Sequence, residues 1–145
     1  MARQERIAEM IAVYQEAAPE VEGLDAQQVA MALETGSVVL VDVRPEAERA
    51  VSRIPGAIDR QEFERRSEEL AGSEVIAYCT VGARSSRYAR ELKASGWRAR
   101  NFDGSLLAWT HAGGELVDSS GEPTRRLHVY GRRWDLAADG YETVW

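Results

Sequence analysis

The chain has 145 residues, enough for one domain with a hydrophobic core but for little more. Apolar residues make up 44% and charged residues 29%, and the net charge of -6 does not indicate a general nucleic-acid-binding role. The single cysteine excludes an internal disulfide, and with only two histidines beside it the sequence indicates no structural zinc site or other metal site.

The N-terminal sequence MARQERIAEM has no apolar signal region, and no stretch is apolar for long enough to cross a bilayer. We therefore expect no membrane partner and a cytoplasmic location, where thiols stay reduced. Apolar residues recurring at i, i+3, i+4 and i+7 predict an amphipathic helix over residues 3–18, ended by Pro19. The apolar stripe, which we expect to pack on the domain, consists of Ile7, Met10, Ile11 and Tyr14.

A second helix is predicted over residues 25–34, with Asp25 as its N-cap and Gly36 just past its end. Two nearly continuous apolar runs, residues 38–43 and 74–79, are typical of strands buried on both faces of a parallel sheet. Alternation of apolar and polar residues predicts a further strand over residues 97–102, and the sequence IPGAI (54–58) predicts a turn that leads into a short strand. Shorter helical segments lie between these strands, and they are predicted over residues 45–52, 61–70 and 85–95. Since strands that alternate with helices form parallel sheets, the sequence predicts an α/β fold.

The sequence after the last predicted strand no longer alternates in this way. Residues 103–117 predict a loop, a short helix and a Gly-Gly turn, and residues 118–124 predict a loop or linker. The tail over residues 125–145 is too aromatic for a disordered segment, so we expect it to dock on the domain as a strand or extended arm. The predicted parts of the chain are an N-terminal helix (1–22), a central domain (23–118) and a C-terminal extension (119–145).

Cys79 ends the second buried strand, and ligands bind outside the carboxyl ends of strands in open α/β sheets. The following helix is predicted to begin near Ser85, and Gly82 lets the short loop between them turn tightly around the sulfur. The loop N–H groups, the helix N-terminus and the charge of Arg84 all favour a nucleophilic thiolate. We therefore expect Cys79 to be presented at the sheet edge rather than buried as an inert thiol. The loop residues are Thr80, Val81, Gly82, Ala83 and Arg84.

Four stretches of the chain, in order and at family-like spacing, resemble segments of the single-domain rhodaneses, a family of sulfurtransferases. They are VLVDVRPEAE (39–48), RIPGAI (53–58), YCTVGARSS (78–86) and FDGSLLAWTHAGGELV (102–117). The resemblance implies a rhodanese-like open parallel sheet of about five strands with helices on both faces. The N-terminal helix and the C-terminal extension would then be docked on this domain.

The resemblance also implies sulfur transfer in two steps, and it implies no cofactor. The Cys79 thiolate would attack the outer sulfur of a small anionic donor such as thiosulfate, leaving a persulfide on Cys79. Cyanide or an external thiol would then take the sulfur; the thiol would be a small molecule, thioredoxin or a sulfur-carrier protein. Residues 80–85 would bind the substrate, with Arg84 orienting the donor and Ser85 capping the helix or bonding the persulfide. Asp42 and Arg44 would support the active loop without taking part in the chemistry.

Three other readings of the loop stay open. Cysteine phosphatases and arsenate reductases of the same fold have a Cys-x5-Arg loop, whereas four residues separate Cys79 from Arg84, which suits a single sulfur atom better. The chain could also be a non-catalytic rhodanese-like module that binds or regulates a partner. A redox sensor would use Cys79 alone and form its disulfide with another molecule. Departures from the family pattern, which bear on substrate preference, are Arg49, Ser52 and Asp103.

Overall fold

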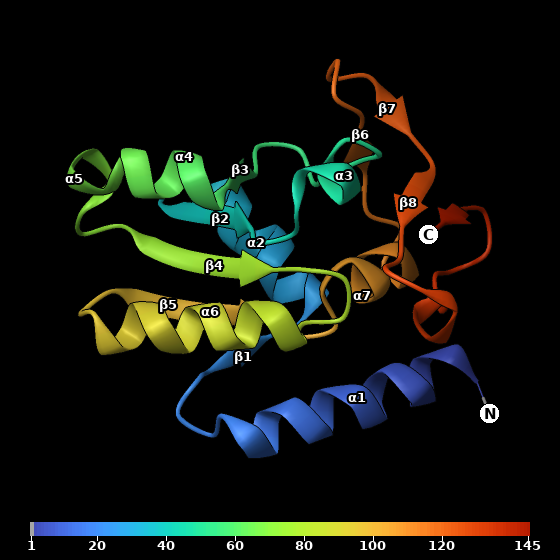
Figure 1. Ribbon diagram of the computed structural model, residues 1–145, viewed down its shortest axis with the longest axis horizontal. Helices are drawn as coiled ribbons and strands as arrows, with labels where there is room; N and C mark the ends of the chain where they lie inside the picture. Colours follow the sequence, from blue (N-terminus) through green and yellow to red (C-terminus); the bar gives the residue numbers. More distant parts are fainter. Residues whose placement is uncertain (1) are drawn as a thin grey trace.

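Five parallel strands form the central sheet of the computed structural model, which describes residues 2–145 (Figure 1). The strands are β1 (Gly23–Leu24), β2 (Val38–Asp42), β3 (Ile58–Asp59), β4 (Glu74–Tyr78) and β5 (Arg98–Phe102). Their order in the sheet is β1-β5-β4-β2-β3, so the strongly apolar β4 lies in the centre. The predicted α/β fold with a parallel sheet is confirmed. The two-residue strand β1, at the edge of the sheet, lies outside the strands that the sequence predicted.

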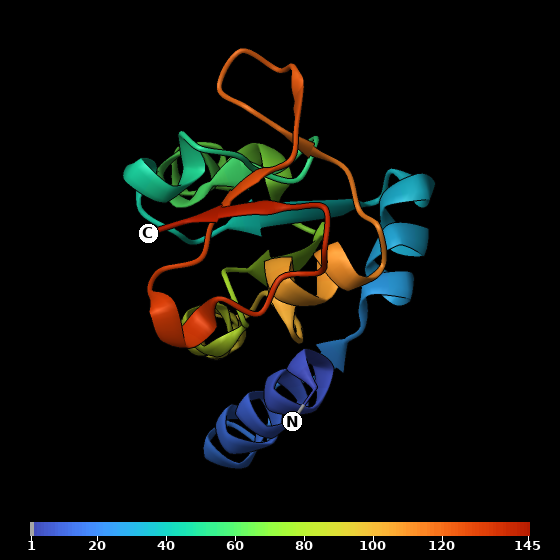
Figure 2. The same cartoon turned by 90° about the vertical axis from the view of Figure 1, so that its right-hand side faces the viewer.

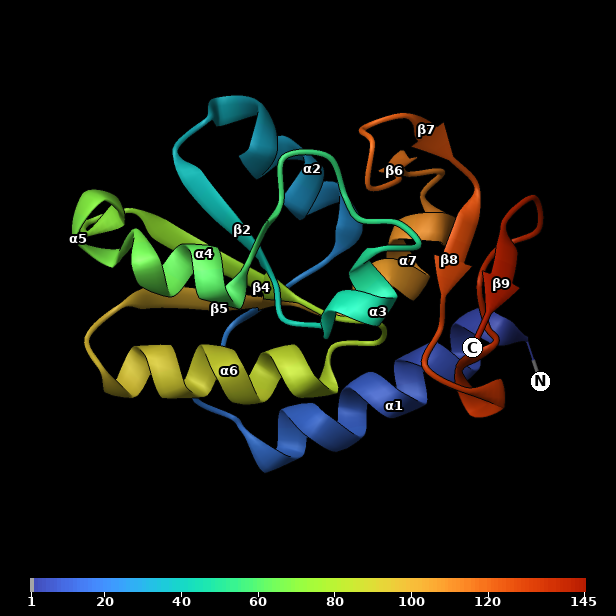
Figure 3. The same cartoon turned by 45° about the horizontal axis from the view of Figure 1, so that its top comes forward.

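Helices cover both faces of this sheet (Figures 1 and 3). They are α1 (Arg3–Ala17), α2 (Ala26–Thr35), α3 (Glu46–Arg49), α4 (Arg60–Arg65), α5 (Ser67–Leu70), α6 (Ala83–Ala94) and α7 (Ser105–His111). On one face, Phe63 of α4 and Leu92 of α6 pack against Val41 and Val75 of the sheet. On the other face lie α2 and α7, and α1 packs against both α7 and α6. None of the helices within residues 2–145 is both long enough and apolar enough to span a membrane.

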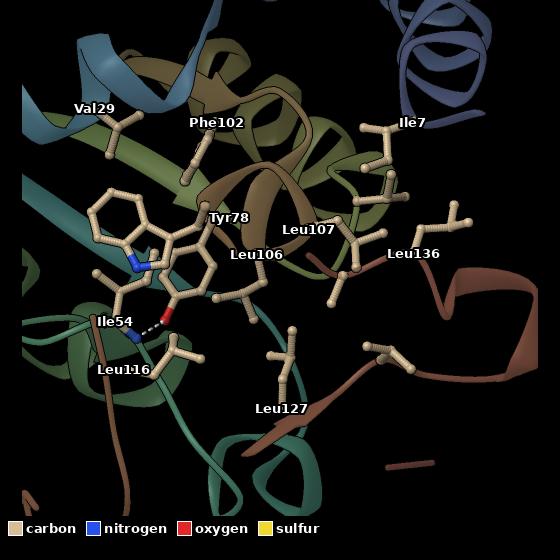
Figure 4. Close-up of a cluster of buried hydrophobic side chains, with 14 of the residues drawn as sticks. Ile7, Val29, Ile54, Tyr78, Phe102, Leu106, Leu107, Leu116, Leu127 and Leu136 are labelled. Carbon is tan, nitrogen blue, oxygen red and sulfur yellow. Dashed lines mark hydrogen bonds between the residues drawn. The ribbon is translucent and has the colours of Figure 1, made fainter. Parts of the chain in front are cut away.

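The larger of the two cores joins both terminal segments to the sheet (Figure 4). Phe102 at the end of β5 and Leu106 of α7 are fully buried in it, together with Leu127 of the C-terminal extension. Ile7 of α1 belongs to the same core, which confirms that the apolar stripe of this helix packs on the domain. Complete burial of a leucine side chain contributes roughly 1.5–3 kcal/mol, so Leu127 helps to hold the extension on the domain.

The C-terminal part of the chain consists of short strands joined by turns. Its elements are β6 (Leu116–Val117), β7 (Pro123–Thr124), β8 (Arg126–His128), the 3-10 helix η1 (Arg132–Trp134) and β9 (Glu142–Val144). β6 and β7 form an antiparallel hairpin where the sequence predicted a loop or linker, because Asp118 accepts N–H bonds from Ser120 and Glu122 and so closes the turn. β8 and β9 pair in parallel, and β8 packs against α3 (Figure 2). The expectation that the tail docks as strands or an extended arm is therefore confirmed.

Two of the predicted helices show how far capping residues and apolar patterns locate the ends of a helix. α2 begins with a capping box between Asp25 and Gln28 and ends at Gly36, whose φ of 70° is left-handed, as predicted. The segment predicted as one helix over residues 61–70 is divided into α4 and α5, because the backbone of Arg66 leaves the helical region at φ -99° and ψ 17°. The boundaries of the three predicted parts of the chain stay a prediction, and Met1 of the first part lies outside the described residues.

The carboxyl ends of three adjacent strands meet at one edge of the sheet. Asp42 ends β2 opposite Tyr78, the last residue of β4, and Cys79 follows immediately. On the other side of β4, the strand β5 ends at Phe102 and is followed by Asp103. This edge therefore brings together the residues from which a site can be built.

Candidate active site

Cys79 is buried, with only 1% of its surface exposed. The expectation that its thiol is presented at the sheet edge is wrong in this respect. The reason is that the loop itself is covered: Thr80 is 2% and Val81 5% exposed, and Tyr14 of α1 packs directly on Gly82. The sulfur thus lies at the predicted end of the strand but beneath the loop rather than on the surface.

The loop turns back toward the Cys79 sulfur, as the sequence predicts. The N–H of Gly82, whose φ is 114°, donates to Sγ of Cys79 at 3.2 Å. Helix α6 begins at Ala83, two residues earlier than predicted, because Gly82 adopts a left-handed backbone and serves as its N-cap. The positive end of the helix dipole therefore lies four residues after Cys79, next to the Gly82 N–H that binds the sulfur.

Ser85 lies close to the sulfur, but its strongest contact is elsewhere. Its Oγ is 3.5 Å from Sγ of Cys79 and 2.6 Å from Oδ1 of Asn101. A hydroxyl has a single proton, and the shorter distance assigns it to Asn101. Asn101 in turn donates from Nδ2 to the carbonyl of Gly82 at 3.1 Å. Ser85 and Asn101 thus hold the first turn of α6 against β5.

The N-terminus of α7 holds the first half of the loop. The N–H groups of Leu106 and Leu107, which have no partner within their helix, donate to the carbonyls of Cys79 at 3.3 Å and Thr80 at 3.0 Å. The N–H of Cys79 donates to Oγ of Ser105 at 3.1 Å. The backbone on both sides of the sulfur is consequently fixed by another element of the fold.

Arg84 is held at the rim of the loop by an ion pair. Its guanidinium makes two hydrogen bonds of 3.0 Å to the buried carboxylate of Glu48 and a third, also 3.0 Å, to Oγ1 of Thr80. The ring of Tyr130 lies 4.7 Å from the guanidinium on another side. Burial by itself would lower the pKa of Arg84, but the hydrogen bonds to Glu48 raise it above its usual value, so the side chain stays charged.

Asp42 and Arg44 form a second, fully buried ion pair. Arg44 donates from Nη2 to Asp42 at 2.8 Å and from Nε at 3.0 Å, and Nη2 also donates to the carbonyl of Ser52 at 2.7 Å. The hydroxyl of Tyr78 donates to Asp42 at 2.7 Å and accepts the N–H of Ile54, the bond drawn in Figure 4. Burial would lower the pKa of Arg44, but the Asp42 carboxylate raises it. The pair ties β2 to the segment that leads into β3.

The free energy of unfolding should decrease as the pH rises above about 10, the usual pKa of tyrosine in an unfolded chain. Burial, followed by the charge of Asp42, raises the pKa of Tyr78 well above 10.0. Its hydroxyl therefore stays protonated in the folded protein and ionises in the unfolded chain, so its contribution is complete below that pH and is lost above it. Urea unfolding between about pH 8 and pH 11 measures the effect. Tyr78→Phe should make the decrease shallower, and an unchanged slope would contradict the assignment.

Several residues that the sequence did not assign to the site contact the loop or the side chains that hold it. They are Tyr14, Glu48, Asn101, Asp103 and Ser105. The sequence identified Tyr14 as part of an apolar helical stripe and Asn101 as a polar residue of the alternating strand. Asp103 replaces a glycine of the family pattern, and it accepts bonds from Gln15 of α1 at 2.7 Å and from Asn101 at 2.9 Å.

The two histidines make structural contacts away from the loop. Nε2 of His111 lies 2.8 Å from the carbonyl of Leu136, and Nδ1 of His128 accepts the N–H of Tyr130 at 3.1 Å. Within residues 2–145, no group of three or more His, Cys, Asp or Glu side chains is arranged to hold a metal ion.

Comparisons with known proteins agree with this architecture. Residues 25–112 match the Rhodanese-like domain family. A sulfurtransferase of Allochromatium vinosum is 33% identical over 103 residues, which are 68% of this chain and 96% of that protein. The crystal structure of thiosulfate sulfurtransferase from Pseudomonas aeruginosa is similar with a TM-score of 0.64 and 26% identity, covering 83% of this chain and 24% of that one.

A third relative has a different description. The HTH-type transcriptional regulator Rv0324 of Mycobacterium tuberculosis is 38% identical over 88 residues, 55% of this chain. The matched region accounts for only 38% of the regulator's length. The family match covers more than half of this chain, and the Allochromatium relative is matched over nearly its whole length. This chain therefore belongs to the rhodanese-like domain family.

Proposed function

We propose that the chain is a sulfurtransferase that carries sulfane sulfur as a persulfide on Cys79. The sulfur would come from a donor such as thiosulfate and pass to an external thiol or, in the test tube, to cyanide. The observation that carries the proposal is the N–H of Gly82, which donates to the Cys79 sulfur from a loop followed directly by a helix N-terminus. Such donors stabilise negative charge on sulfur, whether it belongs to the thiolate or to the outer atom of a persulfide.

The transfer would take place in two displacements. In the first, the Cys79 thiolate attacks the outer sulfur of thiosulfate, a new S–S bond forms, and the old S–S bond breaks with sulfite leaving as the anion. In the second, an acceptor thiolate attacks the outer sulfur of the Cys79 persulfide and releases the Cys79 thiolate. No electrons enter or leave in either step, so the reaction needs no additional oxidant or reductant.

The surrounding residues would have separate roles in this scheme. Arg84 would orient the anionic donor, and its ion pair with Glu48 sets the place at which that charge is held. Residues 80–83 would enclose the outer sulfur, and Asp42 and Arg44 would support the loop without touching the donor. Since Cys79 is 1% exposed, the donor would enter only when side chains at the rim move, and water would be kept from the persulfide at other times.

Two observations weigh on the alternatives. The loop has four residues between Cys79 and Arg84, one fewer than the phosphatase and arsenate reductase pattern. The relative described as a transcriptional regulator favours a regulatory role, but the match covers a minor part of that protein. Sulfur transfer through Cys79 accounts for more of the observed geometry than a phosphatase or arsenate reductase activity or a regulatory role does.

Cys79→Ser should abolish sulfur transfer, because a hydroxyl is a far weaker nucleophile than a thiolate near neutral pH. After incubation with thiosulfate, the intact mass of the wild-type protein should increase by one sulfur atom, and cyanide should then release thiocyanate. The variant should show neither result. Absence of both sulfur loading and turnover in the wild type would refute the proposal. Hydrolysis of an aryl phosphate by the wild type but not by the variant would favour the phosphatase instead.

A further inference from the structure

Tyr14 connects helix α1 to the active loop, although it lies outside the residues that match the family. Its side chain is 8% exposed, and its hydroxyl donates to the carbonyl of Val81 at 3.0 Å. The same hydroxyl accepts the N–H of Gly104, which follows β5, also at 3.0 Å. One buried oxygen therefore joins α1, the active loop and the start of α7.

The bond to Val81 controls the orientation of the peptide group that faces the sulfur. The carbonyl of Val81 and the N–H of Gly82 belong to the same planar trans peptide, so they point in opposite directions. With the carbonyl oxygen held by Tyr14 on one side of the loop, the N–H is directed to the other side. There it donates to Sγ of Cys79 at 3.2 Å.

This peptide needs an anchor because a glycine follows the carbonyl. Gly82 has a φ of 114°, and glycine adopts positive and negative φ about equally readily, so the backbone itself gives the peptide little preference. Tyr14 also packs closely here: a Cβ added to Gly82 would lie 2.3 Å from its hydroxyl oxygen. Burial and then the charge of Asp103 raise the pKa of Tyr14, so the hydroxyl remains a donor at any pH at which the protein would work.

We propose that Tyr14 is a positioning residue of the sulfur site, whose hydroxyl directs the Gly82 N–H at Cys79. It acts through the Val81–Gly82 peptide and does not contact the reacting atoms. The inference rests on the proposed function in one respect: the negative charge that the Gly82 N–H stabilises is that of the Cys79 thiolate or persulfide during sulfur transfer. On this view α1 completes the active loop as well as packing on the domain.

Tyr14→Phe keeps the ring and removes only the hydroxyl, so it should leave the packing of α1 intact. We expect the rate of Cys79 persulfide formation from thiosulfate to fall about tenfold, with KM changed less than about twofold, because one hydrogen bond to a charged group is weakened. The midpoint of the pH profile for alkylation of Cys79 by iodoacetamide should move to higher pH. Hydrogen exchange of the Gly82 amide, followed by NMR, should become faster.

Tyr141→Phe is the matched control. The hydroxyl of Tyr141 also reaches from a segment outside the family match to a backbone carbonyl, that of Gly114, at 2.7 Å. This variant should leave the alkylation profile and the persulfide rate as in the wild type. If Tyr14→Phe behaves like Tyr141→Phe in both measurements, the positioning role is wrong. If the wild type accepts no sulfur but Tyr14→Phe still shifts the alkylation profile, the positioning role stands and the sulfurtransferase proposal fails.

Discussion

Arg44→Met should lower the free energy of unfolding by about 3–5 kcal/mol, the usual cost of breaking a buried ion pair by removing one partner. The Arg44 side chain is 0% exposed and its partner Asp42 is 1% exposed, so water cannot replace the lost cation. Methionine fills part of the same space, but it leaves the carboxylate with the hydroxyl of Tyr78 and the backbone N–H of residue 44 as its remaining donors. Urea unfolding measures the loss.

An exposed ion pair provides the control for this experiment. Arg66 bonds to Glu62 and Glu69 with more than a third of its side chain exposed, so solvent screens these pairs and Arg66→Met should be destabilised far less than Arg44→Met. The double variant Asp42→Asn/Arg44→Met should be more stable than Arg44→Met alone, because no uncompensated charge is left in the core. Similar losses for Arg44→Met and Arg66→Met would show that the buried pair is not a main support of the fold.

The same variants show whether Asp42 and Arg44 only stabilise the fold or also take part in the reaction. If Asp42 and Arg44 only hold the end of β2 and the segment leading to β3, the folded fraction of Arg44→Met should still take up sulfur on Cys79. Its persulfide rate, corrected for the folded fraction, should lie far above that of Cys79→Ser. A rate as low as that of Cys79→Ser would instead give Arg44 a direct part in the reaction.

Much of the fold follows from local patterns of the sequence. The β-branched run at residues 38–43 and the apolar run at 74–79 are typical of strands buried on both faces of a parallel sheet, and they form β2 and β4, which pair in parallel. Asp25 and Gly36 carry their cap signals within a few residues, so α2 could be placed from both ends. The position of Cys79 at the end of a buried strand followed from the same reasoning.

The parts of the site that were missed depend on contacts between distant residues. Tyr14 packs on Gly82 of the loop that buries Cys79, and its bond to Val81 spans 67 residues along the chain. The pairing of Arg84 with Glu48 spans 36 residues, so no local pattern marks it. A helical stripe identifies which face of α1 is buried, but it does not identify the backbone group that a hydroxyl on that face will meet.

Gly82→Ala should damage both the stability and the chemistry of the loop. A residue other than glycine at a φ of 114° is strained by about 1–3 kcal/mol. The added Cβ would also lie 2.3 Å from the hydroxyl oxygen of Tyr14 and 2.8 Å from Cζ, so the loop and α1 would have to separate. Since the Gly82 N–H moves with the loop, persulfide formation on Cys79 should slow by at least about tenfold. Urea unfolding and the rate of sulfur loading measure the two effects.

Gly96→Ala separates backbone strain from the collision with Tyr14. Gly96 has a φ of 94°, and a Cβ added there meets nothing within 4 Å, so this variant carries only the conformational cost. It should be destabilised less than Gly82→Ala and should load sulfur at the wild-type rate. In Gly82→Ala/Tyr14→Phe the nearest colliding atom is gone, so stability should be partly recovered, whereas the rate should not recover because the Val81 carbonyl has lost its anchor. Recovery of both together would mean that Tyr14 only fills space beside the loop.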